Sequence, residues 1–281
     1  MSSPDTTMGD RTPVNQTRFT CVNEIRVRYA DSGGAGLPTV LLTSPWPESL
    51  LAFVPIWPAL SEHFRVVAVD LPGFGGSERR DALLAPEAMG DFLVRFVEEL
   101  DIRPHIVGPD IGTSAALFAV AARPDLFPSV VVGSGGAAVP IDLGDPLRDW
   151  ALAEDLERFR AMDARVIVDA AIDTIDGFVS QEARADYRDS YAGDRFVESM
   201  RYVRRYPVEL PKLAGRLGGI ETPVQIIAGK RDLVVPLVNA EFLADGLPNA
   251  RLSIVDAGHF VWEDAPEEYA SLIVDWVEAH G

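Results

Sequence analysis

The chain has 281 residues, 47% hydrophobic and 24% charged, which is ordinary for a globular protein that buries a large core. A formal net charge of −18 argues against nucleic acid and anionic membrane surfaces as partners, and no apolar run approaches the roughly 18 residues of a membrane span. One cysteine and four histidines without clustered spacing exclude an internal disulfide, favour a cytoplasmic location and give no reason to expect a metal site.

The predicted elements alternate between strand and helix. Residues 1–17 are polar and lack an apolar signal segment, so we expect a disordered tail. Strands are expected as two short segments within 19–29, and then at 39–43, 65–70, 104–108, 128–133, 224–229 and 251–256. Helices are expected at 57–60, 86–100, directly after residue 110, at 237–245 and at 266–279. This alternation predicts an α/β fold with a mostly parallel sheet flanked by helices.

The alternation stops between residues 137 and 217. No strong strand pattern occurs there, and the candidate helices are rich in charged residues, at 146–159, 164–172, 181–187 and 194–205. We therefore predict a helical cap at 137–217, inserted into a core formed by residues 18–136 and 218–281.

Asp110 lies in the turn Gly-Pro-Asp-Ile-Gly, between an apolar strand and a helix of small residues. Small residues two positions before and after a central polar residue are typical of a strained strand-to-helix turn, the nucleophile elbow. An aspartate that caps the next helix is the plain alternative. The position between strand and helix favours a nucleophile.

Two further polar residues follow strands later in the chain. Asp232 comes after the strand at 224–229, and His259 comes after the strand at 251–256 and directly follows a glycine. A carboxylate beside a histidine can fix the tautomer and orientation of its ring. The order Asp110, Asp232, His259 is that of nucleophile, acid and histidine in such folds, and we predict that the three form a catalytic triad.

An aspartate nucleophile implies a particular reaction. Its carboxylate is ionised at neutral pH, attacks an sp³ carbon and forms an ester, and His259 then activates the water that hydrolyses this ester. The oxyanion of that hydrolysis needs backbone N–H donors. We expect them from Ile111, after the nucleophile, and from Trp46, in the loop after the strand at 39–43.

Together these motifs resemble the α/β-hydrolase superfamily, and within it the epoxide hydrolase and haloalkane dehalogenase branch. The resemblance runs from about residue 19 to residue 279. It rests on Pro-Trp-Pro-Glu-Ser at 45–49, Asp-Leu-Pro-Gly-Phe-Gly-Gly-Ser at 70–77 and the motifs around Asp110, Asp232 and His259. It implies a cofactor-independent hydrolase for a small apolar organic substrate.

The chain departs from the family pattern in three places. The oxyanion motif is Ser-Pro-Trp-Pro instead of His-Gly-x-Pro, Ile111 stands where a halide-binding tryptophan is common, and no arginine lies between residues 110 and 122. Epoxide hydrolases also use two cap tyrosines as proton donors. Tyr202 lies where the later tyrosine falls, and the earlier one is missing. Tyr187, Tyr191 or Trp150 are candidates to replace it and to contact substrate, and helix packing is the alternative for Tyr202.

The leading prediction is hydrolysis of an epoxide to a vicinal diol. A haloalkane or haloacid dehalogenase, or another α/β-hydrolase, is the first alternative. A lyase, a cyclase or a ligand-binding protein on the same fold is the second. A serine hydrolase is disfavoured because Ser114 and Ser134 do not occupy the elbow. The sequence is compatible with a monomer or a homodimer.

Overall fold

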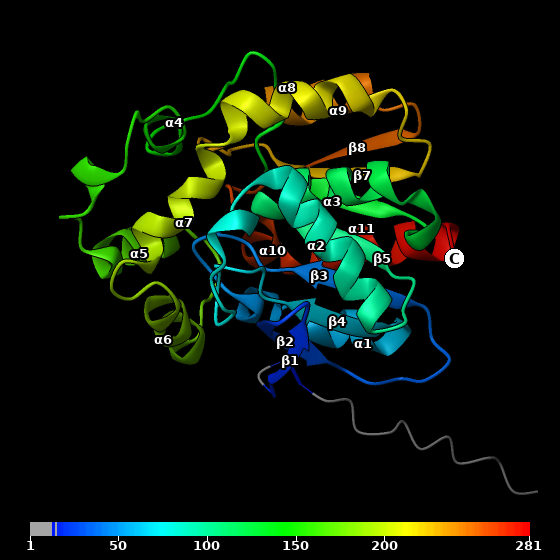
Figure 1. The fold of residues 1–281 in the computed structure, drawn as a ribbon. Coiled ribbons are helices and arrows are strands. Elements are labelled where there is room, and N and C mark those ends of the chain that lie inside the picture. The colour runs from blue at the N-terminus through cyan, green and yellow to red at the C-terminus, as the bar shows by residue number, and fades with distance from the viewer. Residues whose placement is uncertain (1–12, 15) are drawn as a thin grey trace, which may run out of the picture.

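The computed structural model describes residues 13–14 and 16–281 and contains one eight-stranded sheet (Figure 1). The strand order is β1-β2-β4-β3-β5-β6-β7-β8, antiparallel where β1 and β2 join at one edge and parallel from β4 onwards. The strands are β1 Arg18–Val22, β2 Ile25–Asp31, β3 Thr39–Thr43, β4 Arg65–Val69, β5 His105–Pro109, β6 Val130–Gly133, β7 Val224–Gly229 and β8 Ala250–Val255. The predicted α/β fold with a mostly parallel sheet is confirmed.

The inner strands are almost wholly buried because helices cover both faces of the sheet. On one face α1 packs against α11, and on the other α2 packs against α3 (Figure 1). The core helices are α1 Trp57–His63, α2 Pro86–Glu99, α3 Ile111–Ala122, α9 Val238–Gly246, α10 Val261–Asp264 and α11 Pro266–Ala279, with short 3-10 helices η1 Leu50–Phe53, η2 Asp81–Leu83 and η3 Pro124–Leu126.

Between β6 and β7 the chain is helical, as the sequence predicts, and α4 to α7 lie beyond one end of the strands (Figure 1). The elements are α4 Leu147–Ala151, η4 Glu157–Phe159, α5 Ala164–Ile172, α6 Gln181–Ser190, α7 Arg195–Val203 and α8 Tyr206–Leu217. We refer to α4 through α7 as the cap. All parallel strands point their carboxyl ends toward this side, where side chains following those strands meet.

One expected helix in this region is wrong, and one helix was missed. The helix expected at 146–159 is broken into α4 and η4, because the side chain of Arg204 binds the backbone carbonyls of Ala153 and Glu154. Helix α8 was not expected at all. It begins with a proline in its first turn, where no backbone N–H donor is needed. A second proline, Pro211, lies inside the helix, and a proline at such a position argues against a helix when only the sequence is known.

Most of the tail expected at 1–17 lies outside the described residues. Within the described part of that range, Val14 is buried and belongs to the hydrophobic core. Among the residues described, no helix is long and apolar enough to cross a membrane.

Candidate active site

Asp110 occupies the turn between β5 and α3 in a strained conformation, with φ 52° and ψ −122°. The flanking glycines are required. A Cβ at Gly108 would lie 2.6 Å from the carbonyl oxygen of Gly112, and a Cβ at Gly112 would lie 2.2 Å from Oγ1 of Thr43. Strain of this kind persists only where the surrounding structure enforces it, and it is concentrated at functional sites. The turn pushes the Asp110 side chain out beyond the end of the sheet.

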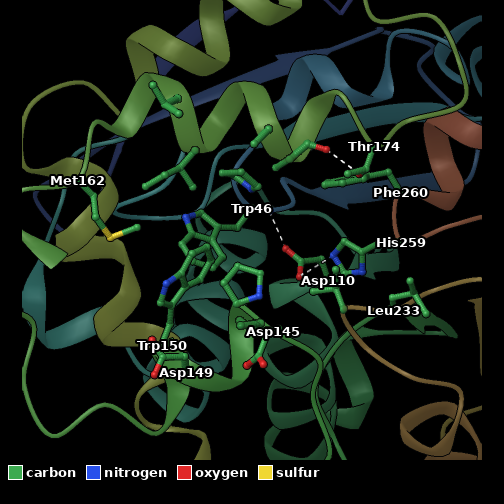
Figure 2. A pocket seen from close by; sticks show the side chains of 18 of the residues that line it. Trp46, Asp110, Asp145, Asp149, Trp150, Met162, Thr174, Leu233, His259 and Phe260 are labelled. Carbon is green, nitrogen blue, oxygen red and sulfur yellow. Dashed lines mark hydrogen bonds and ion pairs between the residues drawn. The ribbon is translucent and has the colours of Figure 1, made fainter. Parts of the chain in front are cut away.

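The two carboxylate oxygens of Asp110 have different surroundings (Figure 2). Oδ2 accepts a hydrogen bond of 2.6 Å from the backbone N–H of Trp46, in the loop after β3. Oδ1 lies 3.7 Å from Nε2 of His259. Ile111, the other expected donor, is the first residue of α3, so its N–H is among those that have no partner within the helix.

His259 lies between two carboxylates. Its Nδ1 is 2.9 Å from Oδ2 of Asp232, while Nε2 faces Asp110. The other oxygen of Asp232 accepts hydrogen bonds of 2.8 Å from the N–H groups of Val234 and Val235. These two bonds fix the carboxylate, which in turn fixes the imidazole ring. The structure thus brings together the three residues that the sequence singled out at three strand ends.

The two carboxylates decide the charge of His259. Burial alone lowers the pKa of His259, but the negative charge of Asp232 and the carboxylate of Asp110 outweigh it and raise the pKa to about 10. The imidazole is therefore a cation at neutral pH while Asp110 is ionised. Any reaction that removes the charge of Asp110 also removes one of the two causes of this high pKa.

A cavity of about 680 Å³ opens above Asp110 and His259 (Figure 2). Its walls come from the loop after β3, from α4 and α5 of the cap, and from the loops after β7 and β8. Most of the lining is apolar, and among the described residues it contains no lysine or arginine. The polar exceptions, besides Asp110 and His259, are Asp145, Asp149 and Thr174.

Two indole rings form part of the wall. Trp46 and Trp150 meet edge to face, with ring centroids 5.4 Å apart (Figure 2). Nε1 of Trp46 has no hydrogen-bond partner among the described residues, but the atom is itself buried and is not exposed to the cavity. This part of the wall is therefore aromatic and apolar.

The three tyrosines singled out from the sequence lie elsewhere. The hydroxyl of Tyr202 donates to the carbonyl oxygen of Ile111 at 2.8 Å and is 3.2 Å from Oγ of Ser114. Tyr187 donates to Glu263, and Tyr191 donates to the carbonyl of Glu48. All three are fully buried, and across the described part of the chain no tyrosine lines the cavity.

Of the expected substrate contacts, therefore, only Trp150 lines the cavity. Sequence reasoning missed the wall that α5 contributes, which includes Val166, Ile167 and Ala171. The amphipathic pattern of α5 could have indicated this wall. From sequence alone, however, the apolar side of such a helix is expected to pack against the protein core and not to line a cavity. No cluster of three or more His, Cys, Asp or Glu side chains suited to a metal ion occurs within residues 13–14 and 16–281.

Comparison with known proteins places the chain among enzymes of one fold. A family model described as "alpha/beta hydrolase fold" matches residues 38–266. A 2-hydroxy-6-oxononadienedioate/2-hydroxy-6-oxononatrienedioate hydrolase from Cupriavidus pinatubonensis is 29% identical over 95% of this chain and 96% of its own length. A 2-hydroxy-6-oxo-6-(2'-aminophenyl)hexa-2,4-dienoic acid hydrolase from Metapseudomonas resinovorans is 25% identical over 92% of this chain and 90% of its own.

Among solved structures, a haloalkane dehalogenase from Bradyrhizobium elkani has a TM-score of 0.79 and 22% identity, covering 94% of this chain and 97% of its own. That likeness concerns the fold alone. The family model covers most of the chain, and many of the similar proteins are hydrolases. The chain belongs to the α/β-hydrolase fold family.

Proposed function

We propose that the protein is a hydrolase that forms an ester between Asp110 and an sp³ carbon of a small apolar substrate. The observation that carries the proposal is the unequal placement of the two oxygens of Asp110. Oδ2 is held by the N–H of Trp46, while Oδ1 is left to attack. Attack by Oδ1 makes Oδ2 the carbonyl oxygen of the ester, already in contact with the donor that its hydrolysis requires.

The second step is hydrolysis of this ester, with His259 as the base. Alkylation neutralises Asp110, so the pKa of His259 falls and the ring can lose its proton. The neutral ring then takes a proton from a water molecule, whose oxygen attacks the ester carbon. The oxyanion forms on Oδ2, beside the N–H of Trp46, and Ile111 is the second expected donor. Collapse of this intermediate restores the carboxylate and releases the alcohol.

The cavity supports an uncharged, apolar substrate. Its lining is mostly hydrophobic, and Asp145 adds negative charge that repels anions, while the charge of Asp149 is paired with that of Arg158. Because no arginine or lysine of the described chain lines it, a carboxylate on the substrate would have no cationic partner other than His259. Haloacids are therefore poor candidates.

The leaving group decides between the two reactions that the sequence suggested. In an in-line displacement it departs on the side of the carbon opposite to Oδ1. A halide leaves without taking a proton, so it needs no acid in the cavity. The cap tyrosines that would protonate an alkoxide are bound to other groups. This favours a haloalkane as the first candidate.

An epoxide is the second candidate, and the charge of His259 favours it. The oxygen of an opening epoxide becomes an alkoxide that must take a proton, and the His259 imidazolium is an acid that lines the cavity. That transfer would leave His259 neutral, which is the state that the second step needs. The vicinal diol would then form without a tyrosine donor.

The test measures the intact mass of two proteins. The wild type is quenched in acid within one turnover, and the variant His259→Gln is measured after a longer exposure to the probe. Each is treated with haloalkanes such as hexyl bromide, and separately with epoxides such as styrene oxide. An alkyl gain without halogen on His259→Gln, mapped to Asp110, supports the first candidate. The second candidate is supported if the quenched wild type gains the mass of a whole epoxide and the same adduct forms more slowly on His259→Gln.

Freshly purified, mass-checked Asp110→Asn is the control, since its amide cannot form the ester. No adduct from any probe in either protein would contradict the ester mechanism and favour a ligand-binding or non-hydrolytic role.

A further inference from the structure

Two acidic side chains lie buried beside the site without a place in the proposed mechanism. Glu48 is 0% exposed and follows Trp46 by two residues, in the loop that supplies the N–H to Asp110. Glu263 is 3% exposed and follows His259 by four residues, in α10. Far apart in the sequence, the two loops meet at these carboxyl groups.

The contacts of the pair show how it is built. The two carboxyl groups are neighbours, each acting on the pKa of the other. Oε2 of Glu48 accepts from Nε1 of Trp262 at 3.0 Å, and Oε1 of Glu263 accepts from the hydroxyl of Tyr187 at 3.3 Å. The remaining oxygens, Oε1 of Glu48 and Oε2 of Glu263, are buried and have no hydrogen-bond partner among the described residues. Two carboxylates have no hydrogen to offer each other, but one proton held between these two oxygens would give both a partner.

The surroundings of the pair favour the protonated form. Burial, followed by the charge of Glu263, raises the pKa of Glu48 well above its ordinary value, and burial raises the pKa of Glu263. The other charges acting on the pair are also negative, from Asp110 on Glu48 and from Asp264 on Glu263. Like charges disfavour loss of the last proton from the pair.

The pair is connected to both halves of the site. The indole of Trp262, bound to Glu48, packs edge on against the ring of His259, with centroids 6.3 Å apart. Two residues before Glu48, the backbone of Trp46 holds Asp110. Tyr187, from α6, ties the cap to the same point.

We propose that Glu48 and Glu263 share one proton and act as positioning residues, which hold the Trp46 loop against the His259 loop for ester hydrolysis. This inference rests on the proposed function. With a haloalkane, ester formation needs only the carboxylate of Asp110, whereas ester hydrolysis needs the Trp46 N–H and the His259 ring in correct mutual placement. For such a substrate the pair should therefore affect the second step and not the first.

The experiment follows the Asp110 adduct by acid quench and intact mass, with hexyl bromide and styrene oxide as probes. In Glu48→Leu the hydrogen bonds are lost, and the ester should decay about 100-fold more slowly with either probe, the cost of a misplacement near 1 Å. With hexyl bromide, whose halide leaves without a proton, the ester should form at the wild-type rate. Glu48→Gln retains a donor for Glu263 and an acceptor for Trp262, so its ester should decay within about threefold of the wild-type rate.

Glu209→Leu is the matched control, because Glu209 is another buried carboxyl, in α8, and accepts from the backbone N–H of Glu87. It should lower the melting temperature without slowing ester decay. Equal slowing of both steps in Glu48→Leu with hexyl bromide, no slowing of decay with either probe, or failure of Glu48→Gln to restore decay would overturn the inference. The absence of any adduct, in His259→Gln as well, would instead contradict the proposed function.

Discussion

The charge of Asp110 should control the pKa of His259, and Asp110→Asn tests this directly. The asparagine amide keeps an acceptor for the N–H of Trp46 but carries no charge. In this respect it imitates the alkylated enzyme, in which Asp110 is a neutral ester. If the proposed cycle is correct, removal of this charge converts His259 from a cation into a base that works near neutral pH.

The size of the effect follows from the geometry. Nε2 of His259 lies 3.7 Å from Oδ1 of Asp110, and two opposite unit charges at that distance attract by about 4 kcal/mol at an effective dielectric constant of about 20. One pKa unit corresponds to about 1.4 kcal/mol, so the pKa should fall by about 3. From the value of about 10 in the wild type, it should reach about 7 in Asp110→Asn. The charge of Asp232 remains and prevents a larger fall.

The assay is an NMR titration of protein labelled with carbon-13 in histidine. The chain contains four histidines, and the spectrum of His259→Gln identifies the resonance of interest. Asp149→Asn is a matched control, since Asp149 also lines the cavity but pairs with Arg158. Its effect on His259 should be small. A pKa in Asp110→Asn within about one unit of the wild type would refute the reasoning, because Asp110 would then not contribute the expected attraction.

Three further predictions concern stability. Since folding raises the pKa of His259 from about 6.5 to about 10, its ion pairs stabilise the fold fully below about pH 6.5 and less as the pH rises. Urea denaturation between about pH 7 and 10 should therefore show a larger loss of free energy of unfolding for the wild type than for His259→Gln. Arg28→Met leaves the fully buried Asp70 without its cation and should cost about 3–5 kcal/mol in the same assay. Gly112→Ala places a Cβ 2.2 Å from a threonine hydroxyl of β3 and should lower the melting temperature and abolish ester formation, whereas Gly215→Ala, in open space within α8, should be neutral or stabilising.

The sequence was informative where function depends on the ends of strands. Each of Asp110, Asp232 and His259 follows a short apolar strand, and parallel strands bring their carboxyl ends to one edge. Their meeting was therefore predictable without knowledge of packing. The glycines around Asp110 were predictable for a steric reason, since a Cβ at either position would lie too close to its neighbours.

The remaining features depend on contacts between segments far apart in the chain. Tyr202 is correctly spaced for a cap tyrosine, but its hydroxyl binds the carbonyl of Ile111, a partner that only the packing of α7 against α3 reveals. The same holds for the buried pair of Glu48 and Glu263, since nothing in either local sequence indicates the other. Helix α8 was missed because Pro211 interrupts a pattern that tertiary packing nevertheless stabilises.

The central claim is that Asp110 is a nucleophile and not a base that activates water. A single turnover of the wild type in water labelled with oxygen-18, with enzyme in excess over substrate, tests it most directly. If water attacks the ester carbon, the label enters the carboxylate of Asp110, found by peptide mass mapping, and the first product carries unlabelled oxygen from the enzyme. Label in the first product, with none on Asp110, would contradict the account.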